Sequence, residues 1–300
     1  MSNPKGASWY SGGGIAHDML PGAGQVFYLY GIDGGIGDNA NNGLTPEAPF
    51  LTLTYALAQC TAEGQDYIVV LDYWQPTGEV WPIVVDVNAV HIIGSFGAGL
   101  QYAQFTPPGD TAVLSIAADR VSVSRLAFTA GATHGCIENA AAGVRWGTLY
   151  EDCWFGVLGA AQDGIRNVAA GDEPYMTVKR CRFGRLLTRD GIRIEHNMSR
   201  GMIGTPWGDG NVFEGIPGIG VNFAGSVAEV GIYNNLFAIP ANTAGAAITL
   251  SAGSENNIVF GNRANFGDTD MGNNPYLDSA GAGSNHWGDN YQGITLVQPA

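Results

Sequence analysis

The segments DGIRNVA at residues 163–169 and DGIRIEH at residues 190–196 begin with the same four letters, and similar segments occur before and after them. Isoleucines of five such segments form a column with separations of 28, 27, 27 and 29 residues: Ile137, Ile165, Ile192, Ile219 and Ile248. A column of phenylalanines runs in step with it: Phe128, Phe155, Phe183, Phe213, Phe237 and Phe266. Two columns that share one period indicate a repeat containing at least two strands.

The segments around both columns are short, alternate apolar with polar residues and are bounded by Gly, Asn or Asp, a pattern typical of β-strands. A repeat of about 27 residues is too short for a propeller blade, and it lacks the helices or the leucine spacing of other repeat classes. The sequence therefore predicts an all-β fold, a single-stranded parallel β-helix whose equivalent residues stack about 4.8 Å apart. About seven coils fit between Val84 and Phe266.

Positions beside the two columns predict where other side chains point. Cys153 and Cys181 each stand two residues before a column phenylalanine, so they should face inward on adjacent coils; a disulfide is sterically possible, but we expect a reduced pair. Asn139 and Asn167 stand two residues after column isoleucines and should form a short inward ladder. Three charged residues directly follow column isoleucines and should face outward, the first two paired across a coil boundary: Glu138, Arg166 and Arg193.

The segment LTLTYALAQC at residues 51–60 carries a helical pattern in a chain that otherwise indicates strands and turns. Leu53, Ala56, Leu57 and Cys60 have the i, i+3, i+4, i+7 spacing of one helical face. Such a short helix is marginal alone and is stabilised by packing on an apolar surface. Because the first coil of a solenoid exposes such a surface, we expect the helix to cap it.

The sequence around this helix resembles a known motif. The run from VFYLYG through GDNANNGLTPEAPFLTLTYAL to DYIVVL, about residues 26–72, resembles the N-terminal cap of right-handed parallel β-helix proteins of the pectate-lyase-like superfold. The resemblance implies a right-handed parallel β-helix with a short N-terminal capping helix, and it says little about chemistry. The expected organisation is an extended N-terminal arm (1–25), a strand, loop and capping helix (26–66), the β-helix (67–266) and a C-terminal tail or cap (267–300).

Composition restricts the partners. The 27 acidic and 13 basic residues give a formal charge of −14, which should repel nucleic acid and anionic membranes. No apolar run approaches the ~20 residues that a membrane span needs, and the N-terminus lacks the continuous apolar segment of a signal peptide. The sequence therefore predicts a protein that is made in a cytoplasm and has no nucleic-acid or membrane partner.

Candidate catalytic residues come from the family that the cap resembles, in which many members cleave acidic polysaccharides. A glycoside hydrolase needs two carboxyl groups about 5 to 10 Å apart on one face. Asp163 and Asp190 each precede a column isoleucine by two residues and should be stacked neighbours, with Arg189 and His196 nearby. However, Asp before Gly is typical of a turn that enters a strand, and the family's catalytic signatures are absent. We therefore expect no catalytic residue; if the protein is an enzyme, these two aspartates are the candidates.

We expect no cofactor, and calcium is the one metal for which the sequence offers ligands. The candidates are Asp38 in GDNANNG and Asp268 and Asp270 in GDTDMGNN, although neither loop has EF-hand spacing and solvated turns explain both. Exposed aromatic side chains can stack on sugars or form subunit contacts, and we prefer an interface for the aromatic residues of the coils: Trp146, Tyr150, Trp154 and Trp207. Trp154 adjoins an inward phenylalanine and should point outward.

Three functions are compatible with these features. We favour a virion structural protein of a tailed bacteriophage, a capsid decoration or a fibre or spike component, made in the host cytoplasm. This assignment rests on analogy, because folds of this type are frequent in phage particles. Its partners would be other virion proteins or its own subunits in a homo-oligomer, of which trimers are common among β-helix fibres; a host surface glycan is a further candidate. The alternatives are a polysaccharide lyase or glycoside hydrolase, such as a tailspike-type depolymerase, and a bacterial surface adhesin.

Overall fold

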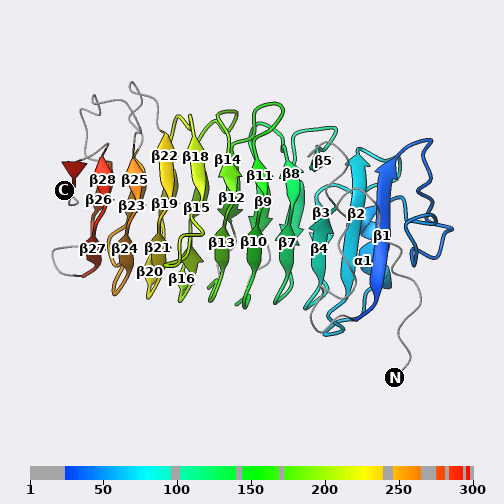
Figure 1. Ribbon diagram of the computed structural model, residues 1–300, viewed down its shortest axis with the longest axis horizontal. Coiled ribbons are helices and arrows are strands. Elements are labelled where there is room, and N and C mark those ends of the chain that lie inside the picture. The colour runs from blue at the N-terminus through cyan, green and yellow to red at the C-terminus, as the bar shows by residue number, and fades with distance from the viewer. Residues whose placement is uncertain are drawn as a thin grey trace.

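The computed structural model of the protein is a right-handed parallel β-helix of about seven turns (Figure 1). It describes residues 24–95, 102–139, 144–168, 172–238, 246–264, 275–280, 284–292 and 295–297. The predicted all-β fold is confirmed, and within these ranges the structure has a single helix, α1 (Leu53–Gln59).

Three long sheets form the sides of the rod. The ten-stranded sheet contains β1 (Val26–Ile32), β2 (Tyr67–Trp74), β4 (His91–Gly94), β7 (Ser122–Ser124), β10 (Leu149–Glu151), β13 (Thr177–Lys179), β17 (Met202–Ile203), β21 (Gly231–Tyr233), β24 (Ile258–Phe260) and β27 (His286–Gly288). The eight-stranded sheet contains β3 (Ile83–Val85), β6 (Leu114–Ile116), β9 (Gly135–Asn139), β12 (Asp163–Asn167), β15 (Ile192–Ile194), β19 (Val221–Phe223), β23 (Ile248–Leu250) and β26 (Tyr276–Asp278). The nine-stranded sheet contains β5 (Ala103–Phe105), β8 (Leu126–Phe128), β11 (Trp154–Phe155), β14 (Arg182–Phe183), β18 (Val212–Glu214), β22 (Leu236–Ala238), β25 (Arg263–Ala264), β28 (Tyr291–Gln292) and the antiparallel β29 (Thr295–Leu296). Two further strands pair with each other, β16 (Met198–Ser199) and β20 (Val227–Ala228).

A stack of aromatic rings runs through the interior of the rod. Adjacent ring centroids are 5.5, 4.9, 4.6 and 4.6 Å apart along the series Phe128, Phe155, Phe183, Phe213 and Phe237. The predicted phenylalanine column is confirmed over these residues, and it extends toward the N-terminus through Phe105 and Tyr73. At the other end the strand partner of Phe237 is Ala264. The register therefore assigns to Ala264 the place predicted for Phe266, which itself lies outside the described residues.

The isoleucine column is confirmed for four of its predicted members: Ile137, Ile165, Ile192 and Ile248. The prediction was wrong at Ile219, because the strand partner of Ile192 is Val221. The amide of Ile219 instead donates a hydrogen bond to Oδ1 of Asp190 at 2.8 Å. Ile219 thus lies level with Asp190, in the turn before the strand.

Polar side chains also stack inside the rod. In one asparagine ladder each Nδ2 donates to Oδ1 of the next amide at 2.9 Å, along the series Asn211, Asn235, Asn262 and Asn290. Cys153 and Cys181 precede this ladder and are buried and free, as predicted, and the backbone amide of Cys181 donates to Oδ1 of Asn211. Asn139 and Asn167 are buried register partners, as predicted, but the Asn139 amide bonds other side chains instead of Asn167.

Helix α1 packs on the N-terminal end of the core, as predicted, and lies beside β1 in Figure 1. Its buried residues belong to the main core: Leu53, Ala56 and Leu57. Cys60 follows the helix and is half-buried, so it extends the predicted face only in part. The carboxylate of Glu79 accepts the amides of Leu53 and Thr54 at 2.6 and 3.1 Å. These bonds satisfy two of the free donors at the helix N-terminus and join the helix to the chain after β2.

We expect Thr52→Ala to lower the free energy of unfolding by about 0.5–2 kcal/mol. Oγ1 of Thr52 caps the helix by accepting the amide of Tyr55 at 3.3 Å, and it also accepts Nδ2 of Asn39 at 3.0 Å. Urea unfolding followed by circular dichroism measures the change. Thr45→Ala is the matched control at an exposed turn residue and should have almost no effect; equal effects of the two substitutions would contradict the capping role.

Beyond residue 266, where the predicted β-helix ends, the sheets continue: β26, β27 and β28 pair in parallel with β23, β24 and β25. The predicted arm (1–25) lies almost entirely outside the described residues. Within the described part of the chain, no helix is long and apolar enough to cross a membrane.

Candidate functional site

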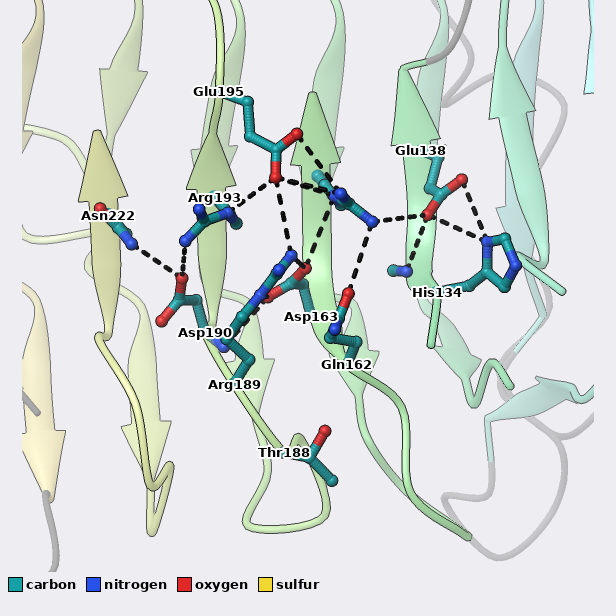
Figure 2. Close-up of polar contacts among 12 residues, drawn as sticks. His134, Glu138, Gln162, Asp163, Thr188, Arg189, Asp190, Arg193, Glu195 and Asn222 are labelled. Atoms are coloured by element: carbon teal, nitrogen blue, oxygen red, sulfur yellow. Dashed lines mark hydrogen bonds and ion pairs between the residues drawn. The ribbon is translucent and has the colours of Figure 1, made fainter. Parts of the chain in front are cut away.

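Asp163 and Asp190 lie on adjacent coils of the eight-stranded sheet, at the start of β12 and just before β15 (Figure 2). The amide of Asp190 donates to Oδ1 of Asp163 at 3.0 Å, so the two residues are neighbours, as the period predicts. Nε of Arg189 donates to the same oxygen at 2.9 Å, and its Nη2 forms an ion pair with Oδ2. The side chains of the two aspartates are only 0% and 3% exposed.

The carboxylate of Asp190 also has its donors inside the protein. It accepts Nη1 of Arg193 at 2.9 Å, Nδ2 of Asn222 at 2.9 Å and the amide of Ile219 at 2.8 Å. Three donors saturate most of the acceptor capacity of a carboxylate and fix the turn that enters the next strand. The two candidate catalytic aspartates are therefore internal hydrogen-bond acceptors that join successive coils.

Above these aspartates the surface of the sheet carries linked ion pairs (Figure 2). Nη1 of Arg166 is 3.7 Å from Oε1 of Glu138, which confirms the predicted pair, and its Nη2 is 3.1 Å from Oε1 of Glu195. Nε of Arg193 donates to the same Glu195 oxygen at 2.8 Å. We call these linked groups the sheet ion-pair network: Glu138, Asp163, Arg166, Arg189, Asp190, Arg193 and Glu195. The network crosses three coils, those of β9, β12 and β15.

The pKa shifts within the network follow from burial and from the arginines. Burial raises the pKa of Asp163, and the hydrogen bond and charge of Arg189 offset only part of that increase. Burial also acts to raise the pKa of Glu195, but Arg193 and Arg166 outweigh it and lower the pKa. Burial thus accounts for the raised pKa of Asp163 without any catalytic requirement.

Some residues around the network could not be found with the predicted register. Asn222 is the strand partner of Arg193 and bonds Asp190, but the alignment on Ile219 placed it two positions away. His196, expected near the aspartates, has its Nε2 at 3.3 Å from the carbonyl oxygen of Val168 on the neighbouring coil. His134 contacts the network, with its Nδ1 3.3 Å from Oε1 of Glu138.

A second ionic group is buried inside the rod, on the coils of β10 and β13. Nε and Nη2 of Arg145 donate to Oε1 of Glu173 at 2.9 and 2.7 Å, and the two side chains are 3% and 1% exposed. Nδ2 of Asn139 donates to the other oxygen of Glu173 at 2.5 Å, and the hydroxyl of Tyr150 donates to Oδ1 of Asn139 at 3.0 Å. Nη1 of Arg145 and both side-chain polar atoms of Asn167 are buried without hydrogen-bond partners.

The calcium candidates fall into two groups. In GDNANNG, Oδ1 of Asp38 accepts the amide of Ala40 at 2.9 Å, an ordinary turn contact. Asp268 and Asp270 lie outside the described residues. Within the described ranges, no three side chains of His, Cys, Asp or Glu are grouped as metal ligands.

The candidate aromatic residues differ in exposure. The expectation was wrong for Tyr150, which is fully buried because it points from β10 into the core. Trp154 points outward, as predicted, and is partly covered by the guanidinium of Arg182, which lies 4.8 Å from the ring centroid. Trp146 is about half exposed and stacks on Tyr175 at 5.7 Å. Trp207 stands apart, because 85% of its surface is exposed.

These features define a parallel β-helix protein with an ion-paired sheet surface. No protein-family model and no curated protein matches the chain. Among solved structures, the chain is similar to the crystal structure of the pectate lyase Pel9A, with 14% identity, a TM-score of 0.41 and coverage of 89% of this chain and 79% of that chain. The fold assignment follows from the strand register of this chain itself.

Proposed function

We propose that the protein is a rigid structural module of a tailed-bacteriophage particle, either a capsid decoration or a fibre or spike component, that serves assembly or surface attachment. The observation that carries the structural role is the sheet ion-pair network, in which the best candidate catalytic carboxylates are buried and used to join coils. The assignment to a particle rests on the resemblance of the N-terminal cap to β-helix proteins.

A depolymerase is the competing function, and one observation favours it: Asp163 and Asp190 are neighbours on one sheet. However, a general acid or nucleophile must reach the glycosidic oxygen or the anomeric carbon of the substrate. Side chains that are 0% and 3% exposed and already accept several hydrogen bonds do not offer that access. The network therefore supports a structural role over a hydrolytic one.

The assignment to a particle is tested by mass spectrometry of phage particles purified from the host that carries this gene. We expect the protein to co-purify with the particle through a density gradient, in a fixed ratio to the major capsid protein. Capsid and tail genes beside its gene would support the same assignment. Absence from purified particles would contradict it, and surface labelling of intact bacterial cells would then indicate an adhesin.

The structural role of Asp163 predicts that Asp163→Asn lowers the free energy of unfolding by about 1–3 kcal/mol. The change leaves the guanidinium of Arg189 without its buried carboxylate partner. Asp209→Asn is the matched control, because Asp209 pairs with Arg180 at 3.2 Å on the surface, where such a pair contributes below about 1 kcal/mol. Thermal unfolding measures both variants.

The depolymerase has its own test on host polysaccharide. If the unaltered protein releases reducing ends or unsaturated products, and Asp163→Asn does not, the protein is a depolymerase instead.

A further inference from the structure

A groove of about 450 Å³ lies along the C-terminal half of the rod, where the chain turns from the ten-stranded to the nine-stranded sheet. Its lining comes from four successive coils: Gly208, Asn234, Asn235, Leu236, Gly261, Arg263, Asp289 and Tyr291. The lining lies between the ten-stranded and nine-stranded sheets, whereas the sheet ion-pair network lies on the eight-stranded sheet, and none of the lining residues belongs to that network. Its polar groups therefore have no role in the site described above.

Trp207 directly precedes Gly208, a residue of the lining, in the chain. An indole with 85% exposure gains almost nothing for folding, since apolar surface stabilises a protein only when it is removed from water. An indole has a large apolar face and one N–H donor, so in this position it is free to contact a ligand. Tryptophan is also the residue type most enriched among the strong contributors to binding.

The turn that carries Trp207 is held firmly in place. The amide of Gly208 donates to the carbonyl oxygen of Thr205 at 3.2 Å, and the amide of Asp209 donates to Oγ1 of Thr205 at 3.2 Å. Nδ2 of Asn234, on the next coil, donates to the same Thr205 carbonyl at 2.8 Å. A fixed turn holds the backbone that carries the indole, so little backbone freedom is lost there when a ligand binds.

The floor of the groove is built from small and polar residues in step with the coils. Asn234, Gly261 and Asp289 occupy equivalent left-handed positions, with φ of 55, 71 and 51°. A Cβ atom at Gly261 would lie 2.5 Å from Oδ1 of Asn234, so glycine keeps this part of the floor open. Arg263 and Tyr291 follow on the strand side, with the guanidinium 5.8 Å from the ring centroid.

We infer that this groove binds a neutral oligosaccharide that lies along the rod, with a sugar ring stacked on Trp207. An indole packs against the apolar face of a pyranose, and Asn, Asp, Arg and Tyr side chains bond its hydroxyl groups. The lining carries one arginine and one aspartate, so their charges cancel and an acidic polymer gains no net attraction. Polar groups repeated on coils about 4.8 Å apart also suit a polymer whose units are of similar length. This inference deepens the proposed function, because it gives surface attachment a ligand.

Isothermal titration of the full-length protein tests the inference. The probes are linear cello-, malto-, xylo- and mannohexaose, with an oligogalacturonate as the acidic comparison. We expect at least one neutral hexasaccharide to bind and Trp207→Ala to weaken that binding by at least about tenfold. Trp146→Ala is the matched control, because it also removes an indole from the surface. Trp146 is about half exposed and lies on another coil, outside the groove. Both variants should keep the thermal unfolding midpoint of the unaltered protein.

Equal binding by the Trp207→Ala and Trp146→Ala variants would overturn the inference, as would the failure of all four neutral probes to bind. Tighter binding of the oligogalacturonate than of every neutral probe would overturn the assignment to neutral sugars. These results are separable from the test of the proposed function. If no glycan binds but the protein is found in particles, the proposed structural role stands and only the inference fails. If the protein is absent from particles, binding that depends on Trp207 can still be measured.

Discussion

Replacing Phe183 with alanine is expected to lower the free energy of unfolding by about 3–5 kcal/mol. The ring is fully buried between Phe155 and Phe213, with centroid separations of 4.9 and 4.6 Å. Its edge also approaches Gly164 so closely that a Cβ atom there would lie 2.5 Å from the ring. Alanine would remove the contacts on both sides and leave a cavity that the neighbouring coils cannot close, because their spacing is fixed by the strand hydrogen bonds.

Chemical denaturation followed by circular dichroism measures this loss, and limited proteolysis reports where the rod opens. Phe260→Ala is the matched control, because Phe260 is 45% exposed on β24 and its removal should change stability by only about 0.5 kcal/mol. In a solenoid each coil is stabilised mainly by its neighbours, so new cleavage sites should appear first near β14. If the two substitutions cost the same, the aromatic stack is not a major source of stability.

The two columns were predictable because stacked positions on a β-helix require the same kind of side chain. A phenylalanine is stabilised by the phenylalanines above and below it, so the residue type recurs wherever the register is kept. The turns between strands carry no such requirement and change in length. This is why the alignment at Ile219 was wrong, since Val221 follows its partner Ile192 by 29 residues. At the C-terminal end the period is kept and the residue type changes instead, because Ala264 follows its partner Phe237 by 27 residues.

The candidate site was predictable only in part for the same reason. The period indicates that Asp163 and Asp190 are neighbours, because both stand two residues before a column isoleucine. It does not indicate that they are buried, since that depends on Arg189 in a turn and on Asn222 in the next coil. The groove beside Trp207 is also made by turns of four coils, so no single stretch of sequence contains its pattern.

The pair of Arg145 and Glu173 leads to the second large effect. Arg145→Met is expected to lower the free energy of unfolding by about 3–5 kcal/mol near neutral pH, because it leaves the Glu173 carboxylate buried without its cation. Burial already raises the pKa of Glu173, while Arg145 acts to lower it. Without the arginine the pKa of Glu173 in the folded protein should rise further above its value in the unfolded chain.

The sign of this shift predicts a pH dependence. An acid whose pKa is higher in the folded than in the unfolded state binds its proton more tightly when folded, so stability falls as pH rises through that interval. The destabilisation caused by Arg145→Met should therefore be largest at pH values above the raised folded pKa of Glu173. At acid pH Glu173 is protonated, and the variant should recover part of the lost free energy of unfolding. Denaturation curves at several pH values, compared with those of the unaltered protein, measure this slope.

Two further variants separate the buried charge from loss of packing. The double variant Arg145→Met, Glu173→Leu should regain most of the lost stability and lose the added pH slope, because a buried pair replaced by apolar residues leaves no unpaired charge. Arg200→Met is the surface control: Arg200 pairs with Glu229 at 2.8 Å, but both side chains are more than half exposed, so the change should have almost no effect on stability and add no new slope. A double variant as unstable as Arg145→Met alone would show that packing of the arginine, and not its charge, supports this part of the rod.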